Sequence, residues 1–166
     1  MDEIRTERLL LRAARPEDLE DMHAVLSNRE AMRFWSTEPH TDVEQTREWL
    51  ESMICDSPAL RVDFIVEYGG RAIGKAGCWR LPQIGFILHP EYWGRGFARE
   101  AMEAVIARVF EGLFVPEITA DVDPRNAASL ALLQRLGFEK TGTASRTWFI
   151  ADEWCDSVYL ALKRPA

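Results

Sequence analysis

Residues 84–102, IGFILHPEYWGRGFAREAM, decide the fold, because they contain a buried strand, a glycine turn and the start of a long helix. The apolar run at 84–88 is too short for a globular helix and has the length of a buried strand. His89-Pro90 ends that strand, since the residue before a proline disfavours helical conformation and proline has no backbone donor. The turn Gly94-Arg95-Gly96 follows, and a helical pattern starts near Phe97.

The Gly94-Arg95-Gly96 turn predicts an anion site. A glycine-rich turn that opens a helix directs unpaired N–H groups and the positive end of the helix dipole at one place, and phosphate is the usual ligand there. Arg95 and Arg99 lie where a cation normally costs ~0.3–1 kcal/mol, which favours a bound polyanion. The alternative is a tight connection in which the glycines serve only the turn. A P-loop is excluded because no Lys-Ser/Thr follows, and Ala98-Arg99 replaces the third glycine of a dinucleotide fingerprint.

Composition predicts one domain over residues 1–166, with 47% hydrophobic and 28% charged residues, as in a soluble globular protein. No apolar run approaches the ~20 residues of a membrane span, and the charged start MDEIRTER does not resemble a signal peptide. We therefore expect a cytoplasmic location and no membrane partner. The net charge of −7 argues against nucleic acid, which favours a basic face.

The cysteines and histidines are isolated along the chain and lack metal-ligand spacing, so no metal site is expected. The thiols are interpreted as buried structural residues. These residues are Cys55, Cys78, Cys155, His23, His40 and His89.

The remaining pattern alternates strands and helices and predicts an α/β fold. The expected strands are 4–13, 64–68, 71–78, 84–88, 118–122, 144–150 and 154–162, with Gly69-Gly70 turning a hairpin. The expected helices begin at Pro16, at Thr41, near Phe97 and after Asn126, which would be an N-cap. The helix from Thr41 would bury Val43, Trp49, Leu50 and Met53 and end at Ser57-Pro58.

Three motifs resemble one known family. The segment 93–98, WGRGFA, resembles the pyrophosphate loop of the GNAT superfamily of acyl-CoA N-acyltransferases, and HPEYWGRGFAREA is similar to its Rim-type branch, named for enzymes that acetylate N-termini of ribosomal proteins. Residues 6–12 and 16–19 are similar to the opening of that branch. The segment from Asn126 to Ser129, with Gly137-Phe138, resembles its Asn-x-x-Ser…Gly-Phe segment. The resemblance covers about residues 4–162.

The resemblance implies a single GNAT-type domain with a mixed, mostly antiparallel sheet flanked by about four helices. Exposed edges of such a sheet favour a homodimer. Acetyl-CoA would be the cofactor, and the turn would hold its phosphates through Trp93, Gly94, Arg95, Gly96, Phe97 and Ala98, with Arg95 the best side-chain partner and Arg135 a weaker one. The pantetheine arm would pair with the main chain of Ile87, Leu88 and His89, and the N–H near Leu88 would stabilise the oxyanion.

By the same resemblance, Ser129 would protonate the leaving thiolate and Asn126 would bind the pantetheine arm. The alternative is that both residues serve only the helix N-terminus. The general base departs from the family pattern, because Gln83 and Trp148 replace acids that relatives carry. The other candidates are Glu38, His40, His89 and Asp121. Because an α-amine of pKa ~8 is partly neutral at working pH and a lysine of pKa ~10.4 is not, this departure favours an N-terminal or small-molecule amine.

An acceptor pocket is expected from the aromatic residues Phe34, Trp35, Trp79 and Trp148, for which core packing is the alternative. The predicted activity is transfer of an acetyl group from acetyl-CoA to a primary amine, such as a protein N-terminus, by direct attack in a ternary complex. Two alternatives stay open. One is acetylation of a small amine (an amino sugar, amino acid or polyamine), and the other is a weakly catalytic acyl-CoA-binding regulatory module.

Overall fold

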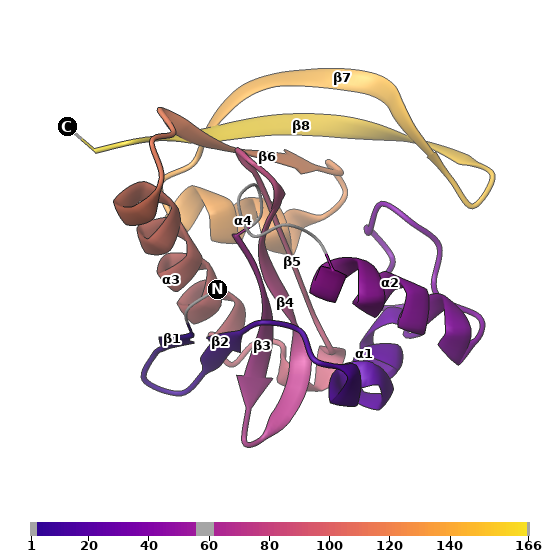
Figure 1. Cartoon of the computed structure of the whole chain (residues 1–166). Coiled ribbons are helices and arrows are strands. Elements are labelled where there is room, and N and C mark those ends of the chain that lie inside the picture. Colours follow the sequence, from indigo (N-terminus) through magenta and orange to yellow (C-terminus); the bar gives the residue numbers. More distant parts are fainter. Residues whose placement is uncertain (1–2, 56–61, 166) are drawn as a thin grey trace.

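A mixed sheet of eight strands lies at the centre of the computed structural model, which describes residues 3–55 and 62–165 (Figure 1). The strand order is β1-β2-β3-β4-β5-β6-β8-β7, and each neighbouring pair is antiparallel except β5 and β6. The strands are β1 (Ile4–Arg5), β2 (Leu10–Arg12), β3 (Val62–Tyr68), β4 (Arg71–Arg80), β5 (Gln83–Leu88), β6 (Glu117–Val122), β7 (Glu139–Ile150) and β8 (Glu153–Lys163).

Helices cover both faces of the sheet and create two cores. They are α1 (Leu19–Leu26), α2 (Val43–Cys55), α3 (Phe97–Gly112) and α4 (Ala127–Arg135). Apolar residues of α3 and α4, such as Met102 and Leu133, pack with the larger core on one face. Residues of α1, such as Met22, pack with Ile65 on the opposite face, where α2 also lies (Figure 1). The expected α/β class, with a mostly antiparallel sheet and four helices in the described chain, is confirmed.

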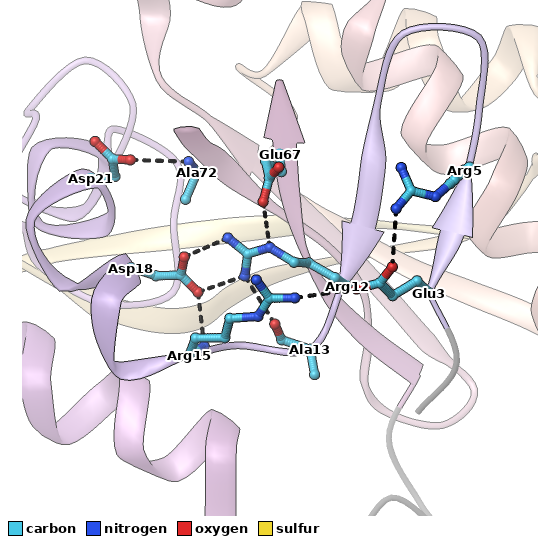
Figure 2. A network of polar contacts seen from close by, with 9 residues as sticks. All are labelled: Glu3, Arg5, Arg12, Ala13, Arg15, Asp18, Asp21, Glu67 and Ala72. Atoms are coloured by element: carbon cyan, nitrogen blue, oxygen red, sulfur yellow. Dashed lines mark hydrogen bonds and ion pairs between the residues drawn. The ribbon is translucent and has the colours of Figure 1, made fainter. Parts of the chain in front are cut away.

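A buried arginine fixes the start of α1 to the sheet. Arg12, which is 4% exposed, donates to both carboxylate oxygens of Asp18 at 2.6 and 2.8 Å and to Glu67 on β3 (Figure 2). Asp18 also accepts from the main-chain N–H of Arg15, which caps the short 3-10 turn Pro16–Asp18 before α1. This network places α1, and with it the loop that follows, against the face of the sheet on which Ile65 lies.

Several local predictions are confirmed. Gly69-Gly70 turns the β3–β4 hairpin, Asn126 caps α4 by accepting from Ser129 N at 3.1 Å, and α4 ends at Gly137, whose φ is +90°. The N–H of Phe138 bonds to Leu133 O and that of Gly137 to Gln134 O, as in a Schellman motif.

Other predictions are wrong. The expected strand 4–13 is two short strands, because Thr6 accepts and donates hydrogen bonds with Leu9 and turns the chain back on itself. The strand expected from 144 already begins at Glu139, where it pairs with Ala161.

The second helix also differs in detail. It is capped by Asp42, which accepts from Gln45 N, and not by Thr41. Val43 is 41% exposed because it precedes the buried stripe that Thr46 and Leu50 form. The predicted end at Ser57-Pro58 lies outside the described residues.

The thiols are not all buried, because Cys55 is exposed and Cys155 is half-exposed. Cys78 is buried, and burial raises the pKa of its thiol to about 12, which leaves it unsuited to act as a nucleophile.

The sheet opens between β5 and β6. These parallel strands share one ladder pair in the described chain, Gln83 with Thr119, supported by a hydrogen bond of 2.9 Å from Thr119 N to Pro82 O. Beyond this point the two strands line opposite sides of a cleft. None of the described helices combines the length and apolar character needed to cross a bilayer.

Candidate active site

The cleft between β5 and β6 has a volume of about 1120 Å³ and brings together most of the residues that the sequence indicated. Its walls come from the N-terminus of α3, from α4, from the loop before α2 and from the β7–β8 hairpin. The candidates that line it are Ile87, Leu88, Trp93, Gly94, Gly96, Phe97, Ala98, Asn126, Ser129, Phe34, Trp35, Trp79 and Trp148. Among the residues expected to bind the cofactor, His89 and Arg95 are not lining residues.

The glycine turn presents an uncapped helix. Gly94 and Gly96 have φ of +69° and +80°, in the left-handed region that favours glycine. Gly96 is the N-cap of α3, and no side chain caps the first turn of this helix. The first N–H groups of α3 therefore point toward the cleft without a partner from the cap, as an anion site requires.

A tether from the N-terminal segment fixes this turn. Glu100 on α3 accepts from Thr6 Oγ1 at 2.6 Å and from the main-chain N–H and the guanidinium of Arg8 at 2.8 and 2.7 Å. Arg8 also donates to the carbonyl of Arg95 at 2.9 Å. Burial raises the pKa of Glu100, but the hydrogen bonds from Thr6 and Arg8 outweigh burial and hold the pKa below its usual value. Sequence reasoning found the segment 6–12 only as a family likeness and did not assign it this role.

The arginines near the turn divide between two environments. The guanidinium of Arg95 lies over Phe97, Tyr68 and Tyr92, at 4.8, 5.3 and 5.7 Å from the ring centroids. Arg99 and Arg135 instead line the cleft, and Arg99 is paired with Glu103 at 2.8 Å. Of the arginines near the turn, Arg99 and Arg135 thus lie on the cleft wall, while Arg95 packs on aromatic rings.

Alternate residues of β5 direct their main-chain N–H and C=O groups toward the open edge of this strand. His89 N donates to Ile73 O of β4 at 2.9 Å, so His89 and Ile87 direct their main-chain groups toward β4. Leu88 and Phe86 therefore face the opposite, open edge. The indole of Trp93 already bonds Leu88 O at 2.8 Å there. Phe86 was missed by sequence reasoning, because the direction of main-chain groups depends on strand register.

On α4, the first turn faces the cleft. Asn126 uses its side-chain oxygen to cap the helix, which confirms the capping role. The hydroxyl of Ser129 makes no hydrogen bond within the described part of the chain and lines the cleft. Ser129 is thus available for chemistry at this wall.

The other end of the cleft is aromatic and carries a carboxylate. Trp79 and Trp148 are 47% and 42% exposed, so core packing does not account for them. The indole of Trp148 donates to Asp121 on β6 at 3.0 Å. Of the four base candidates, Asp121 lines the cleft, while Glu38, His40 and His89 do not. His40 instead bonds Thr46 at 2.8 Å, and burial, with the nearby His23, lowers its pKa.

Arg125 joins three walls at this end. It pairs with Asp123 and with Glu153 of the β7–β8 hairpin, both at 2.7 Å, and lies 5.9 Å from the ring centroid of Phe34. The hydrogen bond from Arg125 holds the pKa of Asp123 below its usual value. Sequence reasoning missed Arg125, whose motif Asp-Pro-Arg has no distinctive spacing. Within the described residues, no cluster of His, Cys, Asp and Glu has the form of a metal site.

Comparison with known proteins agrees with this geometry. Residues 8–139 match the family model described as an acetyltransferase (GNAT) domain. An uncharacterized N-acetyltransferase, p20 of Bacillus licheniformis, is 33% identical over 86% of this chain and 85% of its own length.

Two solved structures share the fold. A spermidine N-acetyltransferase from Vibrio cholerae, in complex with CoA and spermine, has a TM-score of 0.80 at 24% identity, over 96% of this chain and 97% of its own. RimL, a ribosomal L7/L12 α-N-protein acetyltransferase in complex with CoA, has a TM-score of 0.85 at 18% identity, over 98% of both chains. With the family model matched over most of its length, the chain belongs to the GNAT acetyltransferase family.

Proposed function

We propose that the protein transfers the acetyl group of acetyl-CoA to a primary amine by direct attack in a ternary complex. The observation that carries this proposal is the cleft itself. It connects an uncapped, glycine-started helix to an end with aromatic rings and a carboxylate, along the open edge of β5. One side suits a phosphate-bearing thioester, and the other suits an amine. Membership of the GNAT acetyltransferase family supports the reaction class.

The cofactor half would work mainly through main-chain groups. The N–H groups at Gly94–Ala98 would bind the pyrophosphate, with Arg99 and Arg135 as the side chains on the cleft wall. The pantetheine arm would pair with Leu88 and Phe86, whose main-chain groups face the open edge. Binding here thus depends on backbone shape more than on side-chain identity.

The reacting thioester needs a donor for the oxyanion and benefits from an acid for the leaving thiolate. Leu88 N–H would stabilise the oxyanion, and the free hydroxyl of Ser129 would donate a proton to the CoA sulfur. A thiol of pKa ~8.5 is already a fair leaving group, so this acid would assist the reaction without being indispensable.

Asp121 is the base that the geometry supports. Its carboxylate lines the acceptor end, and the hydrogen bond from Trp148 to one oxygen orients it while the other oxygen has no hydrogen bond within the described residues. That oxygen would accept the proton of the attacking amine. Gln83, which replaces an expected acid, lines the cleft on the neighbouring strand.

The acceptor class is proposed to be a protein N-terminus, as suggested by the Rim-type likeness. Relatives named for spermidine acetylation support a small polyamine as the second candidate. A cytoplasmic location and a homodimer built on the sheet edges β1 or β7 stay predictions.

The test is mass spectrometry of an acceptor panel incubated with the protein and acetyl-CoA. The panel contains peptides with free N-termini, N-terminally blocked peptides with free lysines, and small amines including spermidine. An acetylated product from one class names the acceptor, and Asp121→Asn should reduce its formation at least ~10² fold. CoA binding without any product would overturn catalysis in favour of a binding module.

A further inference from the structure

A buried ion pair lies in the sheet beside the acceptor end of the cleft. Lys75 on β4 and Asp63 on β3 are 4% and 5% exposed, and Lys75 Nζ donates to Asp63 Oδ2 at 2.5 Å. The ring of Trp35, which lines the cleft, lies 5.7 Å from Lys75 Nζ. A buried pair gives little net stability compared with apolar residues of similar size, so stability alone does not explain it.

One oxygen of this pair has no partner. Asp63 Oδ1 is the buried side-chain polar atom without a hydrogen bond in the described chain. Such atoms are rare in native proteins, and each one calls for an explanation. Its counterpart Oδ2 is held by Lys75, so the carboxylate is fixed in place with one acceptor oxygen free.

The strand register places this oxygen at the end of a row of paired residues, Asp63, Gly77 and Gly85, of which the last two have no side chain. Asp63 pairs with Gly77 on β4, and Gly77 pairs with Gly85 on β5. Asp63 Oδ1 lies over Gly77, 2.7 Å from where a Cβ on that glycine would be. Gly85 lines the cleft and has open space where its Cβ would be. In the register of the strands, the backbone of Gly77 and Gly85 thus lies between the buried carboxylate and the floor of the cleft, although Asp63 and Gly77 themselves are not among the lining residues.

The same row of residues extends across the cleft to Asp121, the proposed base. Because Gln83 and Thr119 pair in parallel, the residues two further along each strand, Gly85 and Asp121, face each other across the opening. Ala120 and Val122 belong to the core under α3, so Asp121 points to the other face, on which Asp63 also lies with Ile65. Two carboxylates thus lie at opposite ends of one row, with a glycine floor between them.

We propose that Asp63 is a positioning residue of the acceptor site. Its free oxygen, which is closed to solvent in this structure, would accept a hydrogen bond from one water that enters with the attacking amine and holds it over Gly85. Asp63 Oδ1 lies beside Gly77, and the adjacent strands that carry Gly77 and Gly85 are ~4.8 Å apart, close to the span of two hydrogen bonds of ~2.8 Å through a single water. The amine would then donate one N–H toward Asp63 and give up its proton to Asp121. Its lone pair would attack the thioester carbonyl carbon to form the C–N bond and a tetrahedral oxyanion at Leu88 N–H, and the bond to sulfur would then break, with the thiolate taking its proton from Ser129.

Lys75 explains why a carboxylate is tolerable in this position. A lone carboxylate would favour the charged ammonium form of the substrate, which cannot attack. The Lys75–Asp63 pair has no net charge, so it offers a hydrogen-bond acceptor while favouring the ammonium form much less. The site would therefore recognise the neutral, reactive amine.

The inference rests on the proposed acetyl transfer and is tested with the acceptor that reacts in the panel. Asp63→Asn and Gly85→Val should each lower kcat/KM for that acceptor at least ~10 fold, while the CoA Kd measured by calorimetry changes by less than ~2 fold. Gly85 has room for a side chain, so a valine there should block the space between Asp63 and the amine without disturbing the packed sheet. Gly142→Ala, a strand glycine that is not among the cleft-lining residues, is the matched control and should behave like the wild type.

The double variant Asp63→Asn/Gly85→Val separates positioning from a purely structural role. If both substitutions break one path, the double variant loses no more activity than the worse single variant. Losses that multiply, or a Gly85→Val enzyme with wild-type kcat/KM, would overturn the inference. If the wild type acetylates no amine, the proposed function itself fails, and this outcome is distinct from the others.

Discussion

Replacing Gly96 by alanine tests whether the glycine turn is the phosphate site. Gly96 has φ of +80°, and a Cβ there would lie 3.3 Å from Arg8 Nη2. A left-handed conformation costs an L-residue roughly 1–2 kcal/mol. For a chain of 166 residues this lowers Tm by roughly 2–8 °C.

The effect on CoA should be larger than the strain alone. Relaxing the backbone at Gly96 turns at least one N–H of the first turn of α3 away from the phosphates. A hydrogen bond to a charged group contributes ~1.5–3 kcal/mol, so the Kd for CoA should rise roughly 10- to 150-fold. Isothermal titration calorimetry with CoA measures this change, and thermal unfolding measures the strain.

Gly70 supplies the control, because in the β3–β4 turn it has nearly the same φ, +81°, and no atom lies within 4 Å of the position that a Cβ would take. Gly70→Ala should lower Tm by a similar amount and leave the CoA Kd unchanged. If Gly96→Ala lowers Tm but binds CoA as the wild type does, the turn is a structural connection and the phosphates bind elsewhere.

Three further changes follow from the site and its surroundings. Ser129→Ala should lower kcat ~10 fold with an unchanged CoA Kd, because the hydroxyl would act only on the leaving thiolate. Glu100→Gln should weaken CoA binding ~5 fold and destabilise the fold by ~1–2 kcal/mol, since the charge that holds Arg8 is lost. Burial keeps the pKa of His40 below its usual value, so the folded state binds fewer protons than the unfolded state below pH ~6.5. The free energy of unfolding should therefore fall as the pH drops below that value, and His40→Gln should reduce the fall, as measured by urea unfolding at pH 7.5 and pH 5.5.

Each of these three has a clear contrary result. A Ser129→Ala enzyme with the wild-type kcat removes that hydroxyl from the chemistry. A Glu100→Gln protein that binds CoA normally shows that the tether stabilises the fold without shaping the turn. If wild type and His40→Gln lose the same stability on acidification, other groups carry the pH dependence.

Features governed by neighbouring residues were predictable from the sequence. The Gly69-Gly70 hairpin, the Asn126 cap, the Gly137 helix end and the glycine turn at 94–96 that opens a helix each depend on the conformational preferences of a few consecutive residues. Their physics is local, so the pattern alone sufficed.

Features that depend on register or on distant contacts were not predictable. Thr6 and Glu100 are 94 residues apart in the chain, and no periodicity connects them. The row from Asp63 over the two glycines to Asp121 exists only once three strand pairings are fixed. Arg95 shows the same limit, because its position beside the turn suggested a phosphate ligand while the fold places three aromatic rings within its reach.

The single ladder pair between β5 and β6 makes the sheet mechanically divided. Strands β1–β5 and strands β6–β8 form two halves of the sheet that pair at Gln83 and Thr119. Beyond this pair, β5 and β6 are not hydrogen-bonded to each other in the described chain. A cofactor arm lying between β5 and β6 would add hydrogen bonds where the two strands do not pair with each other. The enzyme would then be stiffest when loaded with its donor, and amide hydrogen exchange at Phe86 and Leu88 should slow when CoA is added.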